Sequence, residues 1–154
     1  MNRVPVKRYL RRRETRTQTV KKAIDRLHRM KADKDLHHLC DDITLSDEPS
    51  QVYPGKHCTA VNIEPRDSEN EVAAVFTLRH EAIHARFLTR DGITAVNGMK
   101  GWKHEIEAHE ETVRFGEEWL KREKDKNIQL EIQRQIKEEK RSIEHLKTHP
   151  PEVE

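Results

Sequence analysis

The chain of 154 residues has little apolar and little aromatic material. Only 33% of its residues are hydrophobic and 5% are aromatic, whereas 38% are charged. A globular domain commonly has an apolar share of about 45–50%, so one large core cannot extend along the whole chain. Some of the chain must form solvated helix, tail or partner-covered surface. The length favours a single domain with appendages.

Long hydrophobic runs and cysteines are also scarce. No run of about 18 apolar residues occurs, which excludes a transmembrane helix. The first residues, MNRVPVKRYLRRRETR, lack the apolar centre of a secretory signal. We therefore expect a cytoplasmic protein with no membrane partner. The two cysteines, Cys40 and Cys58, can form at most one bridge and are expected to stay reduced inside a cell.

The formal net charge of +2 hides a strongly basic first segment. Residues 1–31 carry twelve Lys and Arg against two acidic residues, a net +10. Apolar residues recur at spacings of three and four from Val20 through Ile24 and Leu27 to Met30. This spacing predicts an amphipathic helix over about 17–39 with a positive polar face.

A clustered basic face is what phosphate contacts require, so this helix is a candidate for binding nucleic acid or an acidic partner. Arg11, Arg12 and Arg13 are the residues we select for such contacts. No base-reading motif or series of stacking aromatic residues accompanies them. A solvated tail is the plain alternative.

The next segment is β-leaning. Residues 43–45 and 57–63 favour short strands, and residues 53–55 favour a turn between them. We expect a small antiparallel sheet of two or three strands. A capping box formed by Ser68 and Glu71 then predicts a helix that ends near Asp91 and Gly92.

Two further helices are expected. One extends from about 100 to 120 with an apolar face. The other lies beyond residue 120, where nine basic and eight acidic residues fall between 117 and 147. Its thin stripe of Ile128, Ile132 and Ile136 predicts a mostly solvated helical arm, suited to homo-oligomerisation. The expected organisation is a basic helix at 1–40, a core at 41–120 and a charged arm at 121–154.

Residues 80–84 read HEAIH, which is an HExxH motif. On a helix, His80 and His84 lie on one face a turn apart, so both imidazoles can reach one metal ion. Glu81 is turned beside the metal, where it can take a proton from a water molecule. Apolar residues surround the motif, and buried polar groups are costly unless they are paired or bind metal.

A catalytic zinc ion needs a third protein ligand and an open position. The helix after the glycine-containing loop offers Glu105, Glu107 and His109 about 20 residues beyond His84. Glu105 and His109 share a helical face, whereas Glu107 points elsewhere. We therefore prefer Glu105, with His109 as its neighbour, and keep His104, Glu107 and His109 itself as alternative ligands.

This pattern resembles the gluzincin class of zinc metallopeptidases, in which HExxH is followed by a glutamate ligand on a later helix. In order and size the chain looks most like the ImmA/IrrE-type and small phage or bacterial metallopeptidases. The resemblance covers roughly residues 50–120. It implies an α+β, mainly helical fold with a zincin-like core. His104 as the third ligand would instead resemble an all-histidine site of the SprT kind.

The resemblance implies one Zn²⁺ per chain, held by His80, His84 and Glu105, with Glu81 as the general base of peptide-bond hydrolysis in a specific protein target. The resembled families place an edge strand before the motif helix, which here is the 57–63 strand. Tyr53, His57 and His109 are candidates for an oxyanion donor or a ligand-orienting residue. The alternative is a regulatory module that binds nucleic acid or protein around a non-catalytic core.

Overall fold

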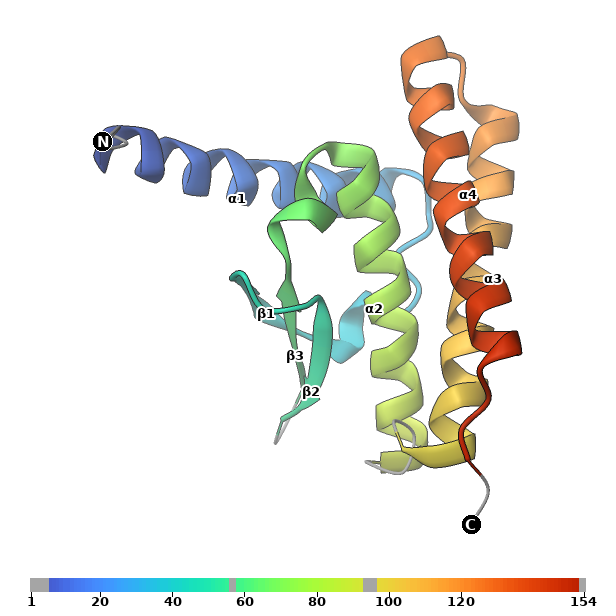
Figure 1. The fold of residues 1–154 in the computed structure, drawn as a ribbon. Helices are drawn as coiled ribbons and strands as arrows, with labels where there is room; N and C mark the ends of the chain where they lie inside the picture. Colours follow the sequence, from blue (N-terminus) through green and yellow to red (C-terminus); the bar gives the residue numbers. More distant parts are fainter. Residues whose placement is uncertain (1–5, 56–57, 93–96, 153–154) are drawn as a thin grey trace, which may run out of the picture.

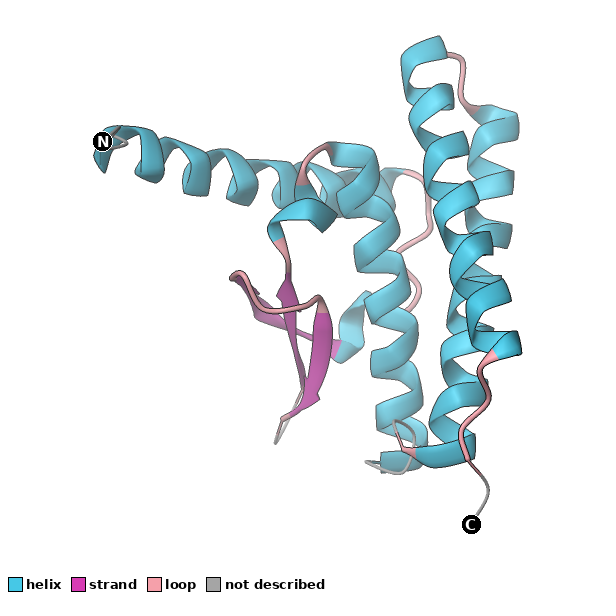
Figure 2. Ribbon diagram, viewed as in Figure 1, coloured by secondary structure: helices cyan, strands magenta, loops and turns pink. Residues whose placement is uncertain are grey.

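The computed structural model describes residues 6–55, 58–92 and 97–152, with only the backbone described at 6–15, 41–42 and 54. The fold is α+β and mainly helical, as predicted (Figure 2). Within the described ranges no helix combines the length and apolar character that a membrane crossing requires. The elements are α1 (Val6–Arg29), a 3₁₀ turn (Leu36–His38), β1 (Leu39–Leu45), β2 (Gln51–Pro54), β3 (Thr59–Ile63), a second 3₁₀ turn (Pro65–Ser68), α2 (Glu71–Asp91), α3 (Gly98–Arg122) and α4 (Lys126–Thr148).

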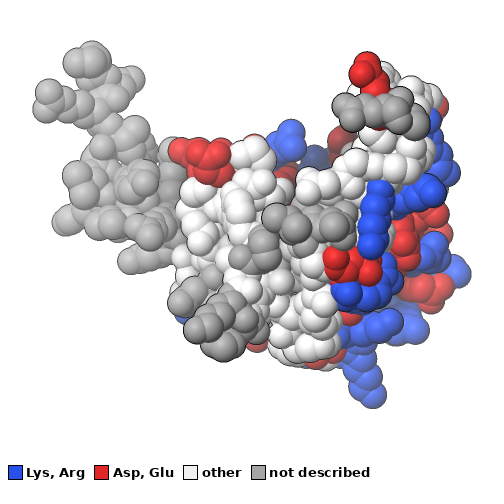
Figure 3. Space-filling model, turned by 90° about the horizontal axis from the view of Figure 1, so that it is seen from below, with Lys and Arg blue, Asp and Glu red and all other residues white. Residues whose placement is uncertain are grey.

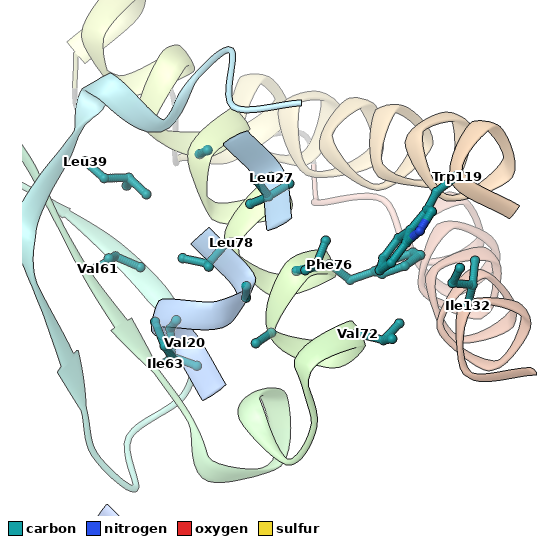
Figure 4. Packing of buried hydrophobic residues seen from close by; sticks show 14 of the residues in the cluster. Val20, Leu27, Leu39, Val61, Ile63, Val72, Phe76, Leu78, Trp119 and Ile132 are labelled. Carbon is teal, nitrogen blue, oxygen red and sulfur yellow. The ribbon is translucent and has the colours of Figure 1, made fainter. Parts of the chain in front are cut away.

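Helix α2 is the centre of the molecule. The sheet lies on one side of it, α3 and α4 lie on the other, and α1 crosses near its first turns (Figure 1). Apolar residues nearly all round α2 explain this position, because a helix that is hydrophobic on every face must be covered on every face. Phe76 lies between the two sides and packs near Trp119 of α3, while Leu78 faces Val61 of the sheet (Figure 4).

The sheet has the order β1-β3-β2 and is mixed. β2 pairs antiparallel with β3, but β1 pairs parallel with β3, so the prediction of an antiparallel sheet is wrong. The reason is that β2 and β3 form a hairpin that occupies one edge of β3, which leaves β1 the other edge. Residues 53 and 54, expected in a turn, belong to β2. β3 is the central strand, so the strand expected at the edge is not an edge strand.

Cys40 and Cys58 form a disulfide, which overturns the expectation of reduced thiols. The parallel pairing of β1 and β3 begins with Leu39 opposite Thr59, next to both cysteines, and holds their Cα atoms 5.1 Å apart. That separation lies in the range a disulfide requires. Disulfides persist mainly in oxidising compartments, so the bridge lends no support to the cytoplasmic prediction.

Helix boundaries differ from the predictions where local capping differs. α1 begins well before residue 17 and ends at Arg29, where Lys31 adopts a left-handed φ of 55°. Asn70, not Ser68, caps α2, since its side chain accepts a hydrogen bond from the backbone N–H of Ala73 at 2.8 Å. The predicted end of α2 is confirmed: the helix stops at Asp91, and Gly92 follows with a φ of 69°.

Helix α4 packs along α3 through its thin apolar stripe, while most of its residues stay exposed, as expected of a mostly solvated helix. Ile132 is fully buried and Ile136 is 7% exposed. Gly116 of α3 permits the approach, because a Cβ there would lie 2.9 Å from Ile136 and 2.7 Å from Phe76. The apolar stripe of α4, which was expected to contact another copy of the chain, packs against α3 of the same chain. Charged side chains of both signs gather on the outer side of these helices (Figure 3).

Candidate metal centre

Helix α2 places the two histidines of the HExxH motif one turn apart on a single face. The Nε2 atoms of His80 and His84 lie 2.9 Å from one another. Both imidazole side chains are 12% exposed. The apolar packing of the surrounding helix residues fixes this face toward α3, so the two rings are held in place before any ligand arrives.

Glu105 on α3 completes a group of three. One of its carboxylate oxygens, Oε1, lies 3.2 Å from Nε2 of His80, and the other, Oε2, lies 3.0 Å from Nε2 of His84. The ligand atoms of the three residues all lie within 4.8 Å of one another, so they can hold a metal ion. The structure therefore brings together the residues that the sequence selects as ligands.

His109 lies beside the carboxylate of Glu105, and each of its two ring nitrogens contacts a carboxylate oxygen. Its Nε2 lies 3.1 Å from Oε1 of Glu105, and its Nδ1 lies 2.5 Å from Oε2 of Glu139 on α4. His80, His109 and Glu139 form a second group whose atoms could hold a metal ion. Since His80 belongs to both groups, we treat them as one candidate centre, to which α2, α3 and α4 contribute residues.

The electrostatics of this centre follow from burial and hydrogen bonding. Burial raises the pKa of Glu105, but hydrogen bonds from His109, His80 and His84 outweigh it and hold that pKa well below its ordinary value. Burial lowers the pKa of His109, but its contacts with Glu105 and Glu139 outweigh this and raise the pKa to about 9. Two carboxylates thus share one imidazolium ion.

Glu81 differs from its neighbours because it is buried, at 5% exposure, and accepts no hydrogen bond from any described residue. Burial raises the pKa of its carboxyl, a shift that nearby His80 and His84 oppose. Glu81 lines a polar cavity of about 410 Å³ together with His80 and His109. A carboxylate in this setting is suited to proton transfer.

Helix α4 forms one wall of the cavity, opposite the beginning of α2. Its contribution is polar and comprises Arg134, Gln135, Glu138, Glu139 and Ser142. Arg134 is fixed by Glu69 at 2.7 Å and by Glu131 at 2.6 Å. The helix expected to be an arm outside the core is therefore a wall of the candidate site.

His104 lies away from the three ligand residues. Its ring stacks on Phe87 with centroids 4.3 Å apart. Its Nε2 lies 3.2 Å from Nη2 of Arg90 and 3.5 Å from a carboxylate oxygen of Asp91. Among the described residues it joins neither group of metal-ligating atoms.

The other predicted residues lie outside the centre or beyond what the structure describes. Glu107 is exposed on α3. Tyr53 is 44% exposed on β2, where its hydroxyl contacts the amide of Gln51, and it does not line the cavity. His57 falls outside the described residues. Arg11, Arg12 and Arg13 lie in α1, where only the backbone is described.

Glu139 is the member of the centre that sequence reasoning does not select. It lies 30 residues beyond His109 in a helix rich in glutamate. The residue type alone therefore does not distinguish it from the other glutamates of that helix. One signal was present: Ile132, Ile136 and Glu139 follow the spacing of one helical side, so a packed apolar stripe carries Glu139 toward the core.

Known protein families, curated proteins and solved structures were all compared with the chain, and none of them matched it. The candidate centre therefore stands on its own geometry.

Proposed function

We propose that this protein is a zinc-dependent metallopeptidase that hydrolyses a peptide bond in a protein target. The observation that carries the proposal is the convergence of His80, His84 and Glu105 beside Glu81, a buried and unpartnered carboxylate that faces a cavity. Resemblance of HEAIH and the later glutamate to gluzincins supports the same activity. Two histidines and one carboxylate are a donor set typical of catalytic zinc.

The spacing of the donor atoms fits a tetrahedral zinc ion. Bonds of about 2.0–2.1 Å to nitrogen and oxygen place the ligand atoms of a tetrahedron about 3.3 Å apart. The two imidazole nitrogens lie 2.9 Å apart, and each lies near a different oxygen of Glu105, at 3.2 Å for His80 and 3.0 Å for His84. Small outward movements of the side chains would let the two imidazoles and the Glu105 carboxylate hold zinc.

The residues then have distinct roles. When bound, zinc supplies a Lewis acid that acidifies a water molecule and polarises the scissile carbonyl. Glu81 takes the proton from that water and delivers it to the leaving amine, for which its raised pKa is well suited. Apolar residues of α2 flank the motif and strengthen these electrostatic interactions.

His109 suits a positioning role better than that of an oxyanion donor. Both of its ring nitrogens are engaged, one by Glu105 and one by Glu139. Partners of this kind orient metal ligands and contribute to metal affinity. We assign Glu139 and His109 to holding the carboxylate of Glu105 toward the two histidines.

The free edge of β2 offers a place for an extended substrate. β2 is at the edge of the sheet and, among the described residues, pairs with β3 alone. Ser50, directly before β2, lines the cavity that contains Glu81. A peptide added to this edge would gain backbone hydrogen bonds and would lead toward the cavity.

The test is cleavage of a proteome-derived peptide library, with new termini detected by mass spectrometry. The zinc-loaded chain should generate termini that disappear when a chelator is present. Glu81→Gln should keep its zinc but reduce the rate by about 10²–10⁴-fold, the usual contribution of a general base. Glu107→Gln, an exposed carboxylate on α3, is the matched control and should cleave normally. Undiminished cleavage by Glu81→Gln would contradict the mechanism.

A second candidate function is nucleic-acid binding through α1. α1 carries ten Lys and Arg against Glu14 and Asp25, and its first half extends past the sheet and α2 (Figure 1). Binding of this type weakens steeply as salt rises. Replacement of Arg11, Arg12 and Arg13 by Gln should reduce affinity for DNA or RNA and flatten the salt dependence. Equal binding by this variant and the parent chain would exclude it.

A further inference from the structure

A second hollow lies between the end of α1 and the face of α3 away from the metal centre. It has a volume of about 660 Å³ and shares no lining residue with the cavity that contains Glu81. Met30, Ala32, Phe115 and Trp119 give it apolar walls. We call it the α1–α3 groove. Neither the metal centre nor the proposed hydrolysis makes use of it.

The rim of the α1–α3 groove is strongly cationic. Arg26 is paired with Glu71 and Glu123, and Arg79 is paired with Asp35 and Glu111. The remaining five cations form no ion pair with any described residue, and all five are exposed: Arg29, Lys31, Lys34, Arg114 and Arg122.

The acidic residues at the rim are engaged mainly by other groups, although Lys34 is near enough to help lower the pKa of Glu111. Glu111 is engaged by Arg79 and Arg86. Glu123 accepts a hydrogen bond from the indole N–H of Trp119 at 2.9 Å, and Glu118 lies 3.3 Å from the ammonium of Lys121. The rim therefore holds an excess of positive charge around an apolar floor.

The backbone fixes part of this rim. Lys31 has a φ of 55°, and the N–H of Ala32 donates to the carbonyl of Leu27 at 2.9 Å as α1 ends. This closed turn leads directly to Lys34. The backbone of the rim comes from this turn and from helix α3, so it is already ordered. Binding therefore costs less conformational entropy.

The floor favours an aliphatic side chain over a nucleotide base. Trp119 is 4% exposed, and its ring already contacts Arg26, Phe76 and Phe115. Little of its surface is open for a base to stack upon, and single-stranded nucleic acid depends on such stacking. A peptide needs only a recess for one or two apolar side chains, which Met30 and Phe115 border.

We propose that the α1–α3 groove binds an acidic peptide segment of a partner protein. Carboxylates of the segment pair with the five unpaired cations, and an apolar side chain between them enters the recess beside Met30 and Phe115. Charge complementarity of this kind speeds association and selects among partners. The proposal is independent of the metal centre, so it holds whether or not the chain hydrolyses peptides.

The experiment selects binders of the full chain from a phage-displayed library of random 12-residue peptides. Selected peptides should carry Asp and Glu around one or two aliphatic or aromatic residues. Arg114→Glu combined with Arg122→Glu should weaken a selected peptide by about tenfold or more. Lys21→Glu combined with Lys22→Glu makes the same charge change on α1 outside the groove, and should weaken binding by less than about twofold.

Two further measurements keep the result unambiguous. Arg114→Gln with Arg122→Gln repeats the test with a milder change, and replacement of the apolar peptide residue by Ser should also weaken binding about tenfold. The proposal is wrong if selected peptides lack acidic residues or if the two charge-reversed pairs weaken binding equally. It is also wrong if a single-stranded oligonucleotide displaces the peptide and loses affinity in the Arg114 and Arg122 variant but not in the Lys21 and Lys22 variant, because the groove would then bind nucleic acid.

Discussion

Helix α2 buries two groups of polar side chains, and the two groups differ in how their charges are balanced. Arg79 and Arg86 meet Asp35 and Glu111 in a closed set of ion pairs, with Asp35 Oδ2 3.0 Å from a guanidinium nitrogen of each arginine. We call these four residues the arginine cluster. Two positive and two negative charges neutralise one another, as a folded scaffold requires of buried charge.

The group around the HExxH motif is not closed in this way. Within the described ranges, the buried Nδ1 atom of His80 has no hydrogen-bond partner and the Glu81 carboxylate accepts no hydrogen bond. Such groups are costly to bury unless something else satisfies them. The comparison teaches that the arginine cluster is balanced by its own ion pairs, whereas the group around the HExxH motif, which we call the motif cluster, has the residues that could hold a metal ion.

The largest effect on folding should come from breaking the arginine cluster. Asp35→Ala leaves Arg79 and Arg86 facing one remaining carboxylate and should cost about 3–5 kcal/mol of unfolding free energy. Chemical denaturation monitored by circular dichroism measures this loss. Zinc affinity, measured in parallel, should change by less than about twofold, because additivity holds between separate clusters. A loss of zinc affinity without a loss of stability would contradict the separate roles of the two clusters.

In the motif cluster, substitution of a supporting residue should change zinc affinity more than folding stability. Glu139→Gln removes the charge that holds His109 and should weaken zinc binding by about 10–100-fold, the usual effect of losing a ligand-orienting partner. Competition with a chromophoric chelator measures the affinity.

Glu144→Gln is the matched control for that change. Glu144 is exposed on the same helix and lines neither hollow that His109 borders. Its substitution should leave zinc affinity unchanged. Equal losses in the two variants would show that α4 supports the centre only through packing.

The smallest effect is the pH dependence of the arginine cluster. Burial raises the pKa of Glu111, but its hydrogen bond with Arg86 outweighs this and lowers it. Because its pKa is lower in the folded protein than in the unfolded chain, Glu111 stabilises the fold at pH values above its unfolded pKa, which is near 4.5. That stabilisation is lost as the pH falls through the pKa of Glu111 in the folded protein. Glu111→Gln should therefore cost about 1 kcal/mol at pH 7. The cost should shrink below pH 4.5; a constant cost down to pH 3 would contradict it.

The sequence predicts best where one helix determines the geometry. His80 and His84 are a turn apart on α2, so their meeting needs no knowledge of tertiary structure. Glu105 is predictable because the residue types that complete such a site are few. Glu139 is not, since its place depends on how α4 packs through Ile132 and on the close approach that Gly116 permits.

The sheet and the cysteines show the same limit. Alternating residues predict strands but not the parallel pairing of β1 with β3, which depends on where β2 lies. That pairing brings Cys40 and Cys58 together, so the disulfide could not be predicted from spacing alone.

The central claim is tested most directly by measuring the zinc content and zinc affinity of the purified chain and of two histidine variants. We predict one zinc ion per chain in the parent protein and in His104→Ala, whose side chain lies against Phe87. His84→Ala should lose about 100-fold or more in affinity, because it removes a direct ligand. Retention of parental affinity by His84→Ala, or its loss in His104→Ala alone, would contradict the assignment.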